Sequence, residues 1–248
     1  MLINIEYLFN KYLIEPKNIS HFGAHVGQEV QSYIDLGFQH INLFEPQKDI
    51  FEILVKSFGS DNRITLFNIG LGSSNQVVPI YSDKENRGES ASVLKPKKHK
   101  ILYPDITFEV NEEINIKRYD SLDIKDVNFL VLDIQGYELE ALKGAQGELI
   151  SVDYIYTEIN REDLYENNTL INDLDKYLAK FNFIRVETRW AKNGLLPWGD
   201  GFYLKENKIK LSTLILNKIK NSYNTSKIYY FYLKIKFHLK FFIKDKLK

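Results

Sequence analysis

Strand-like and helix-like segments alternate along this chain, and turn residues separate them. Candidate strands of predominantly apolar character lie at residues 19–22, 41–44, 64–68, 129–133 and 154–158. The run at 129–133 is apolar up to its last residue, as expected of a strand buried on both faces. Segments with helical periodicity lie between the strands, at 28–36, 49–58, 139–144 and 170–180. This alternation predicts an α/β fold with a doubly wound parallel sheet.

Further elements flank this repeating part. Residues 183–188 and 201–205 are predicted to form two short strands, joined by a loop that contains Trp190 and Trp198. Residues 76–81 are typical of a short extra strand, and residues 86–105 of a long polar loop. The N-terminal residues lack the basic start and the small-residue cleavage site of a secretory signal, so we expect a short helix that packs on the domain.

The first strand leads into a ligand-binding pattern. Residues 19–29 read I-S-H-F-G-A-H-V-G-Q-E, and Glu45 follows the second strand. Glycines at positions 23 and 27 would let the backbone approach a bound molecule, and an acid at the end of the second strand is placed to take the two hydroxyls of a ribose. The pattern therefore predicts an adenosine-like ligand.

His25 separates two classes of such ligands. Dinucleotide-binding turns have the pattern G-x-G-x-x-G, in which the middle glycine makes room for the pyrophosphate. Here the imidazole of His25 occupies that position and would crowd a pyrophosphate. A cofactor with a smaller amino-acid moiety would not be crowded, which favours S-adenosylmethionine (SAM) over NAD.

Most of the chain resembles the FkbM-type SAM-dependent methyltransferases. The resemblance follows H-F-G-A-H-V-G-Q-E (21–29), F-E-P (44–46), N-I-G-L-G (68–72), F-L-V-L-D-I-Q-G-Y-E-L-E-A-L-K-G-A (129–145), Y-T-E-I-N-R-E-D-L-Y-E (156–166) and W-G-D-G (198–201). It implies a seven-stranded class I methyltransferase sheet, which is Rossmann-like and ends in an antiparallel hairpin. It also implies SAM as the cofactor and a sugar hydroxyl of a surface glycan, or of its precursor, as the acceptor.

The cofactor residues expected from the pattern and the resemblance lie at the ends of the first strands. Glu45 is the expected ribose ligand, and Asn68 with Gly70 and Leu71 should contact the adenine. Many SAM enzymes carry an acid at the position of His21, so the methionine ammonium would here need backbone carbonyls or another carboxylate. The full expected set is His21, Gly23, His25, Gly27, Gln28, Glu45, Pro46, Asn68, Gly70, Leu71 and Asp133.

The expected catalytic residues are Asp133, Glu158 and His99. Because ligands lie beyond the carboxyl ends of parallel strands, Asp133 and Glu158 should share one crevice with Glu45 and Asn68. The two acids could bind the acceptor hydroxyl, accept its proton, or hold a Mg²⁺ ion that lowers its pKa. The spacing of the acids does not select among these roles. His99 is a second candidate base.

Two other features have alternative interpretations. The basic run L-K-P-K-K-H-K (94–100) is either a solvated surface or a site for a phosphorylated or acidic glycan. Trp190 and Trp198 either pack within the terminal hairpin or form a stacking wall for a sugar ring.

Composition and charge extend this picture to the ends of the chain. The absence of cysteine excludes disulfides, thiolate catalysis and zinc–thiolate sites, and fits a cytoplasmic protein. Residues 207–248 contain 11 lysines and one acid, a net charge of +10, while residues 1–206 carry −10. We therefore expect a methyltransferase domain at 1–206 and an accessory tail at 207–248, which binds the inner face of a membrane or packs on its own domain or on a second subunit.

The leading hypothesis is a SAM-dependent O-methyltransferase that acts on a glycan. The alternatives are a methyltransferase with a small-molecule or lipid-linked acceptor, and a binding or scaffold module without turnover. An NAD-dependent reductase ranks last, and no nucleic-acid partner is expected. A homo-oligomer is compatible with the sequence.

Overall fold

The structure is a computed structural model that describes residues 1–83 and 87–209. The chain divides into two compact units, Met1–Lys205 and Glu206–Lys248. Only residues 206–209 of the second unit are described, and they include a short 3-10 helix, η4 (Glu206–Lys208). Residues 210–248, which make up most of the predicted tail, therefore lie outside the described residues. None of the helices in the described ranges is long and apolar enough to span a bilayer.

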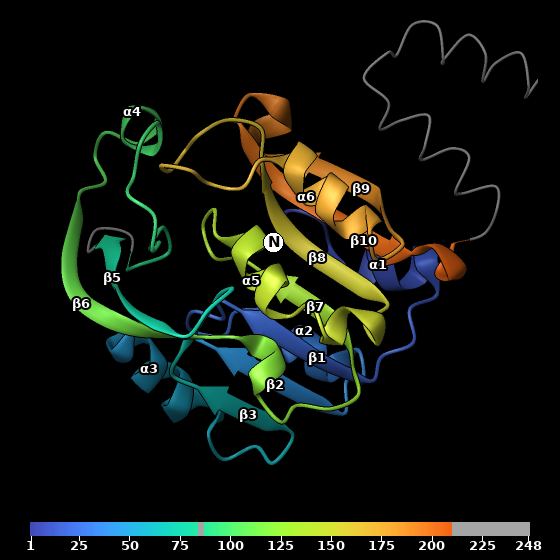
Figure 1. The fold of residues 1–248 in the computed structure, drawn as a ribbon. Coiled ribbons are helices and arrows are strands. Elements are labelled where there is room, and N and C mark those ends of the chain that lie inside the picture. Colours follow the sequence, from blue (N-terminus) through green and yellow to red (C-terminus); the bar gives the residue numbers. More distant parts are fainter. Residues whose placement is uncertain (84–86, 210–248) are drawn as a thin grey trace, which may run out of the picture. The chain divides into compact units, whose positions relative to one another are not determined.

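The first unit is built on a seven-stranded sheet with the order β3-β2-β1-β7-β8-β10-β9 (Figure 1). Its strands are β1 (Asn18–Phe22), β2 (His40–Phe44), β3 (Ile64–Phe67), β7 (Val127–Leu132), β8 (Tyr154–Asn160), β9 (Phe183–Trp190) and β10 (Trp198–Lys205). The pairs from β3 to β8 are parallel, whereas β10 runs antiparallel to both of its neighbours. The predicted doubly wound sheet with a terminal hairpin is confirmed.

Helices cover both faces of this sheet. The helices are α1 (Ile5–Tyr12), α2 (Val30–Asp35), α3 (Lys48–Phe58), α4 (His99–Leu102), α5 (Glu138–Gly144) and α6 (Ile171–Ala179), and the short 3-10 helices are η1 (Tyr119–Ser121), η2 (Glu148–Ile150) and η3 (Ala191–Gly194). Leu130 belongs to the core that α5 and α6 share with the sheet. The adjacent Phe129 instead stacks on Phe9 of α1, so alternate residues of β7 serve opposite faces. The expected N-terminal helix is α1.

A second, three-stranded sheet was only partly predicted. It has the order β4-β6-β5 and consists of β4 (Gly70–Leu71), β5 (Gln76–Asp83) and β6 (Phe108–Lys117). Figure 1 shows β5 and β6 to one side of the main sheet, with α4 beyond their ends. The strand β6 was missed because its sequence, F-E-V-N-E-E-I-N-I-K, is mostly polar, and only Ile114 and Ile116 are buried.

The terminal hairpin corrects the predicted position of the tryptophans. Trp190 is the last residue of β9 and Trp198 the first of β10, so neither lies in the connecting loop. The strand β10 also begins three residues earlier than predicted. Its register places Asp200 directly opposite Glu158 of β8.

Candidate active site

A cavity of about 600 Å³ lies at the carboxyl ends of the parallel strands and extends from β2 to β10. Its volume lies within the range of roughly 300–1,000 Å³ that is usual for small-molecule sites. Among the predicted site residues, it is lined by His21, Gly23, His25, Gln28, Glu45, Pro46, Gly70, Leu71, His99, Asp133 and Glu158. Gly27 and Asn68 do not belong to its wall.

The glycines of the first turn are required by the protein's own packing. Gly23 has φ +82°, and a Cβ atom there would lie 2.0 Å from the backbone oxygen of Asp133. A Cβ atom on Gly27 would lie 2.5 Å from the ring of Phe58. At each position the crowding atoms belong to the protein, and of the two glycines Gly23 lines the cavity.

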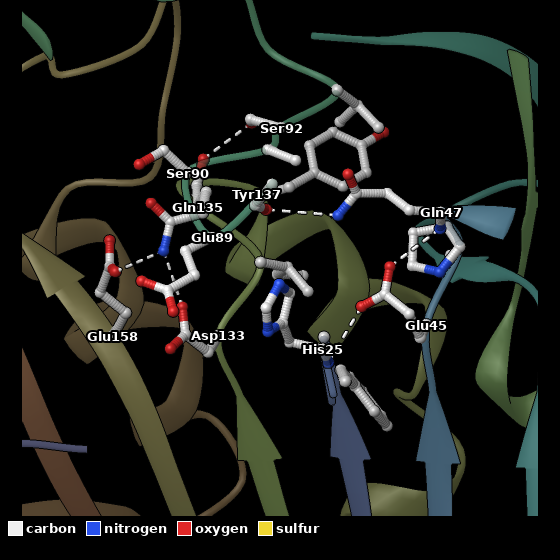
Figure 2. A pocket seen from close by; sticks show the side chains of 18 of the residues that line it. His25, Glu45, Gln47, Glu89, Ser90, Ser92, Asp133, Gln135, Tyr137 and Glu158 are labelled. Atoms are coloured by element: carbon white, nitrogen blue, oxygen red, sulfur yellow. Dashed lines mark hydrogen bonds between the residues drawn. The ribbon is translucent and has the colours of Figure 1, made fainter. Parts of the chain in front are cut away.

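Glu45 is fixed at the end of β2 with its carboxylate toward the cavity (Figure 2). One carboxylate oxygen accepts the backbone N–H of His25 at 3.0 Å, and the other accepts that of Gln47 at 2.8 Å. Burial raises the pKa of Glu45 to about 7, although these backbone hydrogen bonds oppose the rise. The carboxylate is thus held in one orientation and is only partly ionised at neutral pH before a ligand binds.

His25 adopts a left-handed backbone conformation, φ +48°, in the position where dinucleotide binders have glycine. Its ring Nε2 lies 2.9 Å from the backbone oxygen of Arg87, and its Nδ1 lies 3.1 Å from Nε2 of Gln28. The imidazole therefore connects the first turn to the loop that follows β5. The exclusion of a pyrophosphate stays a prediction.

His21 is buried at the base of the cavity. Its Nδ1 is hydrogen-bonded to the hydroxyl of Tyr33 at 3.1 Å, and burial lowers the pKa of His21 to about 4. The ring is therefore neutral and cannot pair with the methionine ammonium as a carboxylate would. Glu29 supplies a carboxylate in the same wall.

The part of the cavity next to Glu45 is apolar. It is lined by Phe44, Pro46, Ile69 and Leu71. Asn68 lies outside this wall, and its amide donates hydrogen bonds to the backbone oxygens of Glu45 and Pro46. Its observed contacts stabilise the backbone turn after β2. An apolar slot for a purine beside a fixed carboxylate for a ribose fits the adenosine moiety of SAM.

Asp133 and Glu158 are connected by the side chain of Gln135 (Figure 2). Its amide nitrogen donates to Asp133 at 2.8 Å and to Glu158 at 3.0 Å. Gln135 itself has φ +52°, a conformation that costs a residue with a side chain about 1–3 kcal/mol. The strained backbone places one amide group between two acids that come from neighbouring strands.

The pKa values of both acids are raised. Desolvation of its carboxyl group in the cavity wall, and then the charge of Asp200, raise the pKa of Asp133 to about 6, and its hydrogen bond from Gln135 opposes the rise. Burial and then the charge of Asp133 raise the pKa of Glu158 well above its usual value. Asp133 is exposed to the cavity, whereas Glu158 is buried. Asp133 is consequently the acid of the two that a ligand can reach.

Two further acids have structural partners. Asp200 accepts hydrogen bonds from the hydroxyl of Tyr156 and from the backbone N–H of Leu2. Glu138 accepts the backbone N–H of Gly136 at 3.0 Å and thereby closes the turn between β7 and α5. Burial raises the pKa of Glu138 to about 7.

His99 borders the cavity but is packed among aromatic rings. Its ring centroid lies 4.8 Å from that of Tyr103, 5.1 Å from Phe108 and 5.5 Å from Tyr165. Its Nδ1 is buried and has no hydrogen-bond partner among residues 1–83 and 87–209, and burial lowers the pKa of His99. The surroundings of His99 are those of a packed core ring.

The basic run around His99 is paired with an acidic run. Lys95, Lys97 and Lys98 lie 3.7, 3.0 and 2.8 Å from Glu166, Asp163 and Glu162, respectively. These exposed ion pairs lie beside backbone hydrogen bonds between residues 95–99 and 163–166. The run therefore holds two loops together through three of its four lysines, Lys95, Lys97 and Lys98.

No cluster of three or more His, Cys, Asp or Glu residues with metal-binding geometry occurs in residues 1–83 and 87–209. The two acids proposed as Mg²⁺ ligands, Asp133 and Glu158, instead share the amide of Gln135. The structure thus offers no support for the Mg²⁺ alternative.

Some functional candidates were not recognised from the sequence. Gln135 lies in the motif D-I-Q-G and Asp200 in the motif W-G-D-G, but neither residue was predicted to have a role in the site. Gln135 could have been found as a polar residue between the last strand residue and a glycine turn. Asp200 could have been found only from the hairpin register, which brings it opposite Glu158.

Comparison with known proteins agrees with this geometry. The methyltransferase FkbM domain family matches residues 21–185. The chain is 21% identical over 188 residues to the 2-O-methyltransferase NoeI of Sinorhizobium fredii, a match that covers 72% of this chain and 77% of that protein. The fold is similar to the crystal structure of methyltransferase FkbM from Methylobacillus flagellatus KT, with a TM-score of 0.54 and 19% identity over 79% of this chain. This chain spans 46% of that longer protein.

Proposed function

The chain belongs to the methyltransferase FkbM domain family, and we propose that this SAM-dependent methyltransferase transfers its methyl group to a sugar hydroxyl. The observation that carries the proposal is the position of Asp133, which is open to the cavity that also contains Glu45 and the apolar slot. The similarity to a 2-O-methyltransferase supports an oxygen acceptor.

In this proposal, different residues along the cavity bind the cofactor and accept the proton. Bound SAM supplies an electrophilic methyl group on a sulfonium sulfur. Glu45 binds the ribose hydroxyls, and the slot between Phe44, Pro46 and Leu71 receives the adenine. The Asp133 carboxylate accepts the proton that the acceptor hydroxyl loses as its oxygen forms the new bond to carbon. A positioned base of this kind typically contributes about 10²–10⁴-fold to the rate.

The test combines labelling with one substitution. The protein is incubated with SAM that carries a labelled methyl group and with fractionated surface glycan or sugar-nucleotide precursors, and the label is then located. We expect it on a sugar oxygen. Asp133→Asn should lower turnover by about 10²–10⁴-fold and change the affinity for S-adenosylhomocysteine much less, because the lost interaction acts mainly in the transition state.

Asp173→Asn on the exposed surface of α6 is the matched control and should leave turnover unchanged. Label on a nitrogen or on a non-sugar product would contradict the acceptor class. Normal turnover by Asp133→Asn would remove Asp133 from the chemistry. Activity that persists in EDTA would be expected, because the proposed base needs no metal.

A further inference from the structure

The strands that line the cavity follow a fixed spatial order. From Glu45, which follows β2, to Asp133, which follows β7, there are two strand spacings, or about 10 Å. Two more spacings, again about 10 Å, lead from β7 to β10. An adenosine bound at Glu45 therefore has its reactive end toward β7, and the volume over β8 and β10 is left for the acceptor.

An aromatic corner, formed by Trp198 and Tyr103, closes that far end of the cavity. Trp198 of β10 lines the cavity, and its indole N–H donates to the hydroxyl of Tyr103 at 3.0 Å. Trp198 and Asp200 are two residues apart on β10, so their side chains share one face and lie about 7 Å apart along the strand. In the register of β10 and β8, Asp200 lies directly opposite Glu158. The space between Trp198 and Asp133, about 10 Å across the strands and about 7 Å along them, has room for one six-membered sugar ring with its substituents.

The second tryptophan differs in its surroundings. Trp190 packs against the hydrophobic core, and the guanidinium of Arg161 lies 4.9 Å from the centre of its ring. It does not line the cavity. Of the two tryptophans in the chain, therefore, only Trp198 can contact a ligand there.

The acidic side chains in the cavity wall favour neutral sugars over sugars that carry a phosphate or a carboxylate. Its wall contains the acids Glu29, Glu45, Glu89, Asp133, Glu158 and Asp200. Among the described lining residues there is no lysine or arginine. A phosphate or a uronate on the acceptor would meet like charges, whereas neutral hydroxyls can donate to carboxylates.

We propose that the cavity over β8 and β10 is the acceptor subsite, and that it binds an uncharged pyranoside whose apolar face lies on Trp198 and whose reacting hydroxyl points to Asp133. This inference rests on the proposed function. A pyranose ring has an apolar C–H face and polar edges, which match a site with an aromatic wall on one side and carboxylates on the other.

The two tryptophans allow a direct measurement. Trp190→Phe leaves Trp198 as the only tryptophan, and Trp198→Phe leaves Trp190. Methyl glycosides of neutral hexoses and 6-deoxyhexoses are titrated into each full-length variant in the presence of S-adenosylhomocysteine. We expect a saturable fluorescence change in the Trp190→Phe protein and none in the Trp198→Phe protein. The corresponding uronates and 6-phosphates should bind at least about tenfold more weakly.

Trp198→Ala should weaken binding of the neutral glycoside by about tenfold and leave S-adenosylhomocysteine affinity within about twofold of wild type. Tyr103→Ala tests the same corner if the first variant does not fold. The proposal is overturned if neither tryptophan responds to any neutral glycoside, if Trp190 responds equally, or if the acidic glycosides bind more tightly. Sugar methylation with an unchanged KM in Trp198→Ala would reject the subsite and keep the proposed function. Binding at Trp198 without methylation of any glycoside would reject the function and keep the subsite.

Discussion

At the scale of single residues, Glu45 shows how backbone geometry prepares a side chain for a ligand. Two N–H groups hold its carboxylate oxygens, and burial nevertheless raises its pKa to about 7. Ribose hydroxyls donate more strongly to a carboxylate than to a carboxylic acid, so ligand binding should favour the ionised form. We therefore expect cofactor binding to be coupled to the release of a proton near neutral pH.

The first prediction follows from that coupling. S-adenosylhomocysteine should bind about tenfold more weakly at pH 6 than at pH 8, because the ionised fraction of Glu45 falls by about that factor around a pKa of 7. Glu45→Gln should remove this pH dependence and weaken binding at pH 8 by about 1.5–3 kcal/mol. Calorimetry in buffers of different ionisation enthalpy measures both effects. Glu52→Gln, on the exposed side of α3, is the control. A flat profile for the wild type would disprove the coupling.

A site residue could be predicted from the sequence where the residues next to it in the chain define its position. Glu45 and Asp133 each follow an apolar run, so their place at the edge of the sheet follows from local pattern alone. Gln135 acts through contacts to two different strands and to Tyr165, which no local pattern contains. Trp198 could not be distinguished from Trp190, because the hairpin register decides which of them reaches the cavity.

At the scale of elements, the main sheet was predictable because its central strands are buried and therefore largely apolar. The strand β7 is buried at all six positions. The small sheet carries most of its residues at the surface, and six of the ten residues of β6 are exposed. Solvent accepts nearly any side chain there, so the sequence of β6 retains little of the pattern that marks a strand. Residues of the loop that joins β5 to β6, such as Ser90 and Tyr103, line the cavity, so this part of the wall could not be predicted from the sequence.

The second prediction concerns the turn between β1 and α2. Gly23→Ala should lower the free energy of unfolding by about 1 kcal/mol for the left-handed backbone and by roughly 1–3 kcal/mol more for the collision with the Asp133 backbone. Gly194→Ala is the matched control, because Gly194 has φ +91° but a Cβ atom there would have no neighbouring atom within 4 Å. Urea denaturation compares the two variants. Equal losses would mean that the close approach of β7 does not require the glycine.

At the scale of the whole molecule, buried acids make stability depend on pH. Burial raises the pKa of both Glu45 and Glu138 from their usual value of 4.5 to about 7. The folded protein then binds more protons than the unfolded chain between pH 4.5 and 7, so stability falls as the pH rises through that window. His21 acts in the opposite direction, because burial lowers its pKa from 6.5 to about 4 and the unfolded chain takes up its proton first.

The third prediction is that the ligand-free protein is less stable at pH 7.5 than at pH 5.5, by an amount on the order of 1–3 kcal/mol, because the acids with raised pKa, Glu45, Glu138 and Asp133, outweigh His21. Glu138→Gln keeps an oxygen acceptor for the backbone N–H of Gly136 and removes the titrating group. It should flatten the profile and stabilise the protein at pH 7.5. Urea denaturation across this range measures the effect. Stability that rises with pH would contradict the assignment.

The charge of the chain is divided between two regions of opposite sign. Residues 1–206 carry −10 and residues 207–248 carry +10, and the methyltransferase motifs end before the second region. We propose that the basic region binds an anionic membrane surface, such as the inner face of the cytoplasmic membrane. Each lysine near such a surface contributes about 1 kcal/mol, so partial engagement of the 11 lysines would suffice for attachment.

The fourth prediction separates this proposal from the alternative, in which the basic region neutralises the acidic domain of its own or a neighbouring subunit. Full-length protein should sediment with anionic vesicles at low salt and be released at high salt, because screening shortens the range of the attraction. A chain truncated after Glu206 should bind S-adenosylhomocysteine normally and no longer sediment, since the cavity lies wholly within residues 1–205. Neutral vesicles are the control. The membrane proposal is wrong if the full-length protein does not sediment with anionic vesicles, or if truncation unfolds the domain. Either result would favour the alternative, in which residues 207–248 pack on the acidic domain.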